Sequence, residues 1–223
     1  MLKKLTEEKL AEVLRAGISE FAEHGFYHAS MSVIAGRAGI SVGVLYKYYA
    51  DKEEFFLACL KTCMRDLDQA LMDVAEPKDC LMVYADRLIR GLQKYAREQR
   101  DCIRLYNRLA AGGVPGGEKL VEKIEGLTAR LYTGFIETAK RDGTVRRDID
   151  ARLFAFFFDN LLMMMQFSYT CDYYRERFRI YCGKDMPDQD EYVRKELLKF
   201  FGSAFTIGQS ETAFESGTEE GNL

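Results

Sequence analysis

Apolar residues recur three and four positions apart along most of this chain, and nowhere do they alternate with polar residues for long. The first such stretch predicts a helix that Thr6 caps and Gly25 ends. Its expected buried face carries Leu10, Leu14, Ile18 and Phe21. Because the same spacing returns in the later stretches, the sequence predicts an all-α protein.

Residues 30–52 predict two short helices joined by a tight turn. Ser30 can cap a helix at about 31–38, and Ser41 can cap one at about 42–48. Gly39 lies between them, where a left-handed backbone costs glycine little. The second helix has about seven residues, too few to hold itself together in water, so packing must support it. This arrangement is typical of a helix-turn-helix, whose second helix is presented to a groove of DNA.

Six further helices are predicted after this unit. The first begins at Asp51, which forms a capping-box-like start with Glu54, and it runs to about Ala75, ahead of Pro77. Four others are expected at 79–98, around Ile103–Leu109, from Leu120 to near Asp142, and at about 189–208. The glycine-rich segment 110–118 breaks the chain, and 171–188 is expected to be a loop or a frayed helix end.

The remaining helix, 153–167, is apolar nearly all round, which predicts burial on more than one side. A membrane span would need about 20 apolar residues, and Asp159-Asn160 interrupts this run. We therefore expect no membrane insertion. We expect instead that this helix is shared between a core and a subunit interface, where it pairs with the last helix in a homodimer.

The local distribution of charge is more informative about a partner than the net charge of the chain. The net charge of −3 gives no sign of a nucleic-acid partner. Residues 24–50, however, contain Arg37 and Lys47 and no Asp or Glu. A surface free of carboxylates is what a phosphate-facing module requires.

Candidate chemistry elsewhere is sparse. The six cysteines show no CxxC pairing, and no histidine completes a metal site, so we expect reduced, mostly buried thiols and no bound metal. His24 and His28 lack a catalytic partner, and no glycine-rich phosphate loop is present. With no apolar signal-peptide core at the N-terminus, the sequence predicts a cytoplasmic protein that is neither an enzyme nor a holder of a cofactor.

The second short helix has two distinct sides. Leu45 and Tyr49 lie on one side and are expected to pack inward, while the role of Tyr48 stays open between packing and contact. Glycine on the other side permits close backbone approach, a valine can touch a thymine methyl, a tyrosine can bind a phosphate, and a lysine can reach a guanine edge or a phosphate. The residues of that outward side are Gly43, Val44, Tyr46 and Lys47.

Residues 8–58 resemble the tetracycline-repressor (TetR) family of bacterial transcription regulators. The matching residues are Gly25-Phe26, Ile34-Ala35, Ala38-Gly39-Ile40-Ser41, Gly43, Leu45-Tyr46, Tyr49 and Lys52. Val42 and Val44 depart from the polar residues frequent in the family, and Ala29 departs from its usual threonine. The resemblance implies DNA contacts by Ser30, Arg37, Val42, Gly43, Val44, Tyr46, Lys47 and Lys52. For Lys52, an ordinary solvated lysine is the alternative to a phosphate contact.

The resemblance also implies a domain organisation. We expect a DNA-binding domain at 1–52, a connecting helix at 53–76, a helical effector-binding and dimerisation domain at 77–209 and a disordered acidic tail at 210–223. Such a protein binds a double-stranded inverted-repeat operator as a homodimer, most often as a repressor.

A small apolar or aromatic effector is implied in the second domain. Its candidate pocket walls are Tyr84, Tyr106, Phe135, Phe157, Met163, Met164 and Met165. Asp159 could meet a cationic ligand or form a salt bridge at a subunit interface. Two alternatives stay open for the whole chain: a regulator that acts through protein partners without an effector, and a helical module that no longer binds DNA.

Overall fold

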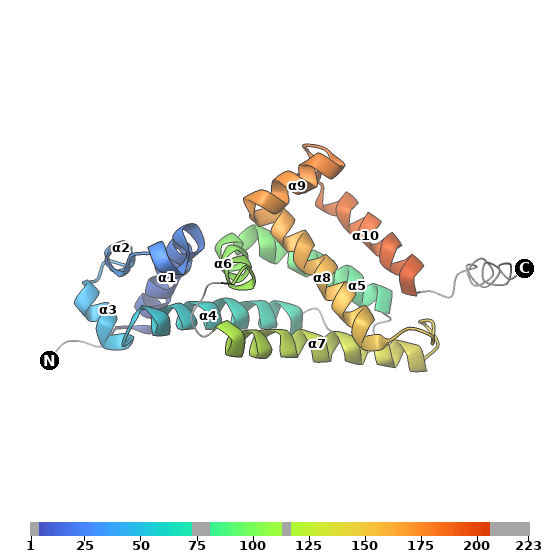
Figure 1. Cartoon of the computed structure of the whole chain (residues 1–223), viewed down its shortest axis with the longest axis horizontal. Helices are drawn as coiled ribbons and strands as arrows, with labels where there is room; N and C mark the ends of the chain where they lie inside the picture. The colour runs from blue at the N-terminus through green and yellow to red at the C-terminus, as the bar shows by residue number, and fades with distance from the viewer. Residues whose placement is uncertain (1–4, 73–80, 113–116, 206–223) are drawn as a thin grey trace, which may run out of the picture.

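The computed structural model describes residues 5–72, 81–112 and 117–205, and within these ranges the chain is helical without strands. The helices α1 to α3 form a group at one end of the molecule, and α4 leads from it to the remaining helices (Figure 1). The helices are α1 Glu7–His28, α2 Met31–Arg37, α3 Val42–Tyr48, α4 Lys52–Met72, α5 Leu81–Glu98, α6 Arg100–Ala110, α7 Gly117–Arg141, α8 Ala151–Thr170, α9 Asp172–Cys182 and α10 Asp190–Phe205, with a 3₁₀ turn η1 at Met186–Asp188.

The side chains expected to cap the first three helices do so. Thr6, Ser30 and Ser41 accept hydrogen bonds from the backbone amides of Lys9, Val33 and Val44. Gly39 adopts a φ of 63°, the left-handed conformation predicted for the turn. The predicted start of α4 is also confirmed, because Asp51 accepts from the Glu54 amide at 2.8 Å and Glu54 accepts from the Ala50 amide at 2.6 Å.

The buried face of α1 is partly the predicted one. Ile18 and Phe21 are buried as predicted, Leu10 and Leu14 are only partly buried, and Val13 and Gly17 are buried as well. Because Gly17 has no side chain, the ring of Phe55 on α4 comes close to α1 there. At Gly25 the backbone leaves the helical conformation, and one further turn carries α1 to His28. Aromatic rings of α1 and α4 pack around Phe21, including Phe55, Phe56 and Phe26.

A Gly17→Ala variant is expected to lose about 1–3 kcal/mol of unfolding free energy, because the new methyl overpacks a filled core. Its Cβ would lie 2.5 Å from two ring carbons of Phe55 and 2.8 Å from the sulfur of Cys59. Gly36→Ala is the matched control, since nothing lies within 4 Å of its Cβ and alanine favours an exposed helix. Urea unfolding of both variants measures the difference; equal midpoints would contradict this packing.

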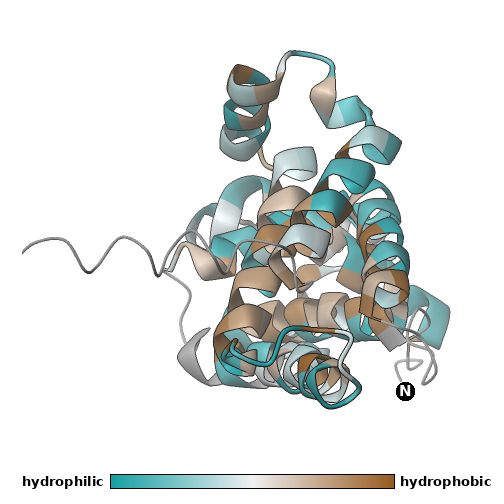
Figure 2. Cartoon of the chain, turned by 90° about the vertical axis from the view of Figure 1, so that its right-hand side faces the viewer, coloured by the Kyte–Doolittle hydropathy of each residue, from teal (hydrophilic) through white to brown (hydrophobic). Residues whose placement is uncertain are grey.

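The helices beyond α4 pack as layers around a common core. Helix α8 packs against α5, α6, α7 and α9, and α5 also packs against α10. Figure 2 shows hydrophobic residues gathered toward the middle of this group and hydrophilic ones outside. The first half of α8 buries Ala155, Phe158 and Leu162 within the chain and leaves Phe156 and Phe157 exposed, whereas the consecutive residues Met165, Gln166 and Phe167 in its second half are all buried. No helix among the described residues is long and apolar enough to cross a bilayer.

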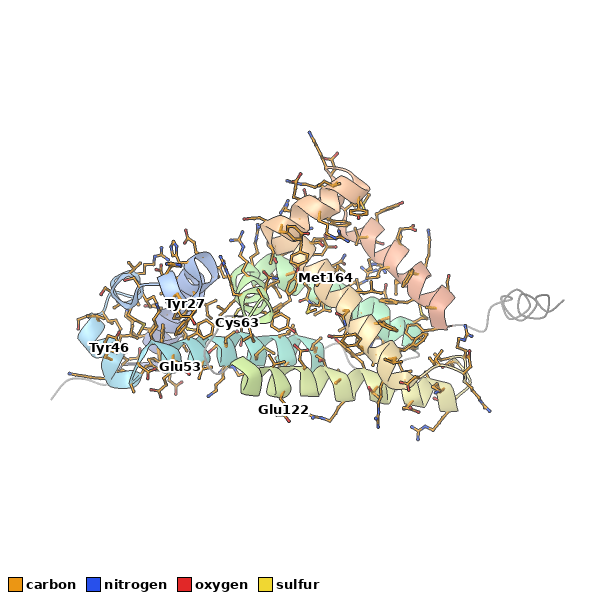
Figure 3. All side chains as sticks on the ribbon, in the orientation of Figure 1. Tyr27, Tyr46, Glu53, Cys63, Glu122 and Met164 are labelled. Carbon is orange, nitrogen blue, oxygen red and sulfur yellow. A yellow bond between two sulfur atoms is a disulfide. The ribbon has the colours of Figure 1, made fainter. Side chains whose placement is uncertain are left out.

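Two expectations about this half of the chain are wrong. The segment 171–188, expected to be a loop or a frayed helix end, forms α9 and η1. In α9 only Tyr174 and Phe178 pack against the core, while Ile180 and Tyr181 are exposed, so its apolar residues do not mark a single buried face. Arg175 holds it to η1 through Asp188, at 3.3 Å. Moreover, not all the cysteines are thiols: Cys63 on α4 and Cys102 on α6 form a disulfide, and Figure 3 shows Cys63 where these helices meet.

Some predicted features lie outside the described residues. They are the end of the connecting helix near Pro77, the first residues of the helix expected at 79–98, and the acidic tail at 210–223. The boundaries proposed for the domains are therefore kept as a proposal.

Candidate nucleic-acid interface and C-terminal cavity

Helix α3 is held in place from one side. Leu45 is the buried residue of this helix, with 1% of its surface exposed. The ring of Tyr49, which follows α3, packs edge-on against Phe55 at a centroid distance of 4.8 Å. Tyr48 accepts a hydrogen bond from the backbone amide of Leu5 at 2.5 Å. Leu45 and Tyr49 thus pack inward as predicted. Tyr48, whose role the sequence leaves open between packing and contact, bonds to the backbone of Leu5 just before α1.

The other side of α3 faces solvent. Gly43, Tyr46 and Lys47 are exposed, while Val42 and Val44 are partly buried. Figure 3 labels Tyr46 at the end of the molecule. Among the described residues, neither Tyr46 nor Lys47 has a hydrogen-bond or ion-pair partner. A β-carbon on Gly43 would meet only the Ser41 hydroxyl, at 4.0 Å. The surface is therefore open to close approach by another molecule.

A buried carboxylate that the sequence did not single out organises α2. Glu20 on α1 is only 3% exposed and accepts the backbone amide of Ser30 at 3.0 Å. Its other oxygen lies 3.2 Å from a guanidinium nitrogen of Arg37. Glu20 therefore fixes both ends of α2 against α1. The spacing of Glu20 seven residues after Val13, on the face that proves buried, was the available signal.

Arg37 and Lys52 are both engaged within the chain. The guanidinium of Arg37 faces Glu20 and, at 4.0 Å, Glu23. The Lys52 ammonium donates to the backbone carbonyl of Tyr27 at 3.1 Å and lies 5.2 Å from the ring centre of Phe26. Burial lowers the pKa of Lys52, and the charge of Glu20 opposes that shift. Both cations are near the presented surface, and their DNA contacts remain predictions, as does that of partly buried Ser30.

A cavity of about 860 Å³ lies between α6, α7 and α8. Of the predicted pocket residues, Tyr106, Asp159 and Met163 line it. Tyr84 is buried and stacks on Phe135 at 3.9 Å, and Met165 is buried too. Phe157 is 55% exposed on the far side of α8. Neither these four residues nor Met164 is among the cavity's lining residues.

The polar groups of the cavity include one that sequence reasoning missed. Glu125 on α7 accepts a hydrogen bond from the hydroxyl of Tyr106. Desolvation, followed by the negative charge of Glu125, raises the pKa of Asp159 to about 6. Burial and the bond to Glu125 also raise the pKa of Tyr106. Helical spacing in the sequence could have pointed to Glu125, because it lies on the same face of α7 as Thr128 and Tyr132.

No cluster of three metal-ligating side chains occurs in the part of the chain that the structure describes. The arrangement offers instead a presented helix pair at one end and a cavity at the other. Helix α6 connects them. It lines the cavity through Tyr106 and Leu109, packs against α1, and donates from Arg108 to the Glu23 carbonyl at 3.2 Å.

Known proteins match both parts of this architecture. Residues 13–59 match the model of a family described as bacterial regulatory proteins, tetR family. The HTH-type transcriptional regulator HbdR of Aromatoleum sp. (strain CIB) is 31% identical over 146 residues, which cover 64% of this chain and 62% of that protein. A TetR family transcriptional regulator from Chloroflexus aurantiacus has the same fold, with a TM-score of 0.71 at 19% identity over 92% of this chain and 96% of that one. FadR from Bacillus subtilis, solved in complex with stearoyl-CoA, has a TM-score of 0.69 at 16% identity over 87% of this chain and 98% of its own.

Proposed function

The chain belongs to the TetR family of bacterial regulatory proteins, and we propose that it is a homodimeric repressor that a small molecule releases from its operator. The observation that carries the proposal is the surface of α3, where Gly43, Tyr46 and Lys47 are exposed on a helix fixed from behind by Leu45. A recognition helix needs this combination, because base edges are read only by side chains held in a fixed orientation.

The proposed contacts divide by chemistry. Tyr46, Ser30, Arg37 and Lys52 can bind phosphates, which positions the protein without reading sequence. Lys47 can reach a base edge or a phosphate, and Val42 and Val44 offer apolar contact to thymine methyl groups. Because so few of these residues can donate to bases, DNA shape and the spacing of two half-sites are expected to contribute to specificity.

The exposed apolar side of α8 supports a dimer. Phe157 is 55% exposed there and Leu161 36%, and Phe200 on α10 is 58% exposed. Large apolar side chains gathered on the surface of one chain mark an interaction site. Two helices from each subunit would bury them in a four-helix interface with two-fold symmetry. The two recognition helices would then reach successive major grooves, about 34 Å apart.

Release would follow from differential affinity. A ligand in the cavity contacts α6, α7 and α8, and α6 packs directly against α1 of the DNA-binding unit. If the ligand binds more tightly to the conformation in which that unit cannot bind DNA, it shifts the population away from the DNA-binding conformation.

A gel-shift titration tests the proposal. The DNA flanking the protein's own gene should form a specific complex whose affinity falls steeply between two salt concentrations, because phosphate contacts release counterions. Absence of a specific complex there, and of any enriched sequence in a random library, would overturn it.

A Lys52→Ala variant is expected to weaken binding to all DNA sequences alike and to reduce the salt slope by about one, since a phosphate contact carries no base information. Lys61→Ala is the matched control, because Lys61 is exposed on the same helix, more than two turns further along. Binding curves at several salt concentrations measure both. An unchanged salt slope would instead assign Lys52 to its bond with the Tyr27 carbonyl, and a changed sequence preference would contradict a phosphate contact.

A further inference from the structure

The cavity between α6, α7 and α8 has a narrow inner end. This inner pocket of about 40 Å³ reaches α4 and α5 and shares Tyr106, Glu125 and Asp159 with the larger outer cavity. The two spaces therefore adjoin at these side chains. A ligand that fills the outer cavity contacts Asp159, which also lines the inner pocket.

The inner pocket is lined by three carboxyl groups and by no positively charged side chain among the described residues. These carboxyl groups belong to Asp68, Glu125 and Asp159. Glu125 accepts from Tyr106, while Asp159 has no hydrogen bond or ion pair to any described residue. Gln166 adds an independent observation: it is 8% exposed, and its side-chain oxygen has no partner. Buried acceptors of this kind cost free energy unless a donor reaches them.

The outer cavity has a different character. Its walls include the apolar side chains of Leu109, Val121, Phe156 and Met163. Its charged arginines, Arg130 and Arg152, are both exposed to solvent. The site thus presents an apolar body and an acidic, acceptor-rich end, with a volume suited to a small organic molecule.

We propose that this cavity binds an amphipathic amine, whose protonated nitrogen pairs with Asp159 at the inner pocket while its apolar body fills the outer space. A protonated amine supplies the positive charge that the inner pocket lacks, together with N–H donors for its acceptors. The inference deepens the proposed function, on which it rests for the amine's role as effector. A fatty acid whose carboxylate entered the inner pocket would instead meet three carboxyl groups.

The amine should bind the ionised form of Asp159. The groups that face it are Tyr106 from α6, Glu125 and Tyr132 from α7 and Asp68 from α4. Because the pKa of Asp159 is raised to about 6, the carboxylate is available at pH 8 and mostly protonated at pH 5. Affinity should therefore fall roughly tenfold between pH 8 and pH 5.

Dodecylammonium and dodecanoate, below their micelle-forming concentrations, are probes of equal chain length and opposite charge. Titration calorimetry on the DNA-free protein should show that the ammonium binds and the carboxylate binds at least tenfold more weakly. An Asp159→Asn variant should bind dodecylammonium about 30-fold or more weakly than the natural protein, as expected when one member of a buried charge pair is removed. Glu122→Gln is the control, because Glu122 is exposed on α7 outside the cavity lining (Figure 3).

A thermal melt of the same variants checks that they are folded. Since the raised pKa means that ionised Asp159 destabilises the folded state above pH 6, Asp159→Asn should melt at a higher temperature than the natural protein at pH 8. Tighter binding of dodecanoate than of dodecylammonium, or equal ammonium affinity in Asp159→Asn and natural protein, would overturn the proposal. DNA binding is measured separately by gel shift, so failure of operator binding alone would overturn the proposed function and leave amine binding standing.

Discussion

A Leu45→Ala variant is expected to lose specific DNA binding while the rest of the protein stays folded. Leu45 is the buried residue of α3 and is 1% exposed. Removing a buried leucine side chain costs about 2–5 kcal/mol, and a helix of seven residues has no intrinsic stability to replace it. Every 1.4 kcal/mol lost from the docking of α3 would lower DNA affinity about tenfold.

The matched control for this prediction is Tyr46→Ala on the same helix. Tyr46 is 46% exposed, so its removal should leave stability within about 0.5 kcal/mol of the natural protein and weaken DNA binding only through the lost contact. Gel shifts and hydrogen exchange of the α3 amides separate the two variants. Leu45→Ala with full operator affinity and protected α3 amides would show that Leu45 does not hold the recognition helix.

The DNA-binding unit was largely predictable because its determinants are local. Ser30 and Ser41 each lie three residues before the amide that they cap, and Gly39 lies at the turn itself. Glu20 escaped prediction because its partners, Ser30 and Arg37, are brought to it only when α2 folds back on α1. The spacing of Glu20 from Val13 shows only that the two residues share a helix face, and a charged residue on such a face is expected to be exposed until its partner is known.

The order of the second group of helices was predictable except for α9, which the sequence did not predict, and the details were much less predictable. The pocket residues were chosen as aromatic and methionine side chains, yet such residues fill a core as readily as they line a cavity. Tyr84 and Phe135 stack on each other at 3.9 Å and lie outside the cavity lining, whereas Glu125, a polar residue on an inward face, lines the cavity. Helix α9 has no fully buried residue, and only Tyr174 and Phe178 pack against the core, so its apolar pattern is too weak to predict a helix.

The Cys63–Cys102 disulfide is expected to contribute about 2–4 kcal/mol to the free energy of unfolding. It closes a loop across 39 positions, and constraining the unfolded chain to that extent lowers its conformational entropy. A Cys63→Ser/Cys102→Ser double variant should therefore unfold at lower urea concentration than the natural protein. Reductant should lower the midpoint of the natural protein toward that of the variant and leave the variant unchanged.

Cys182→Ser provides the control, since Cys182 is an exposed free thiol and its replacement should not move the midpoint. The bond joins α4, which leads out of the DNA-binding unit, to α6, which lines the cavity and packs against α1. Its loss should therefore also increase hydrogen exchange where α4 meets α6, before the DNA-binding unit itself opens. A natural protein with the same unfolding midpoint with and without reductant would show that this cross-link does not stabilise the fold.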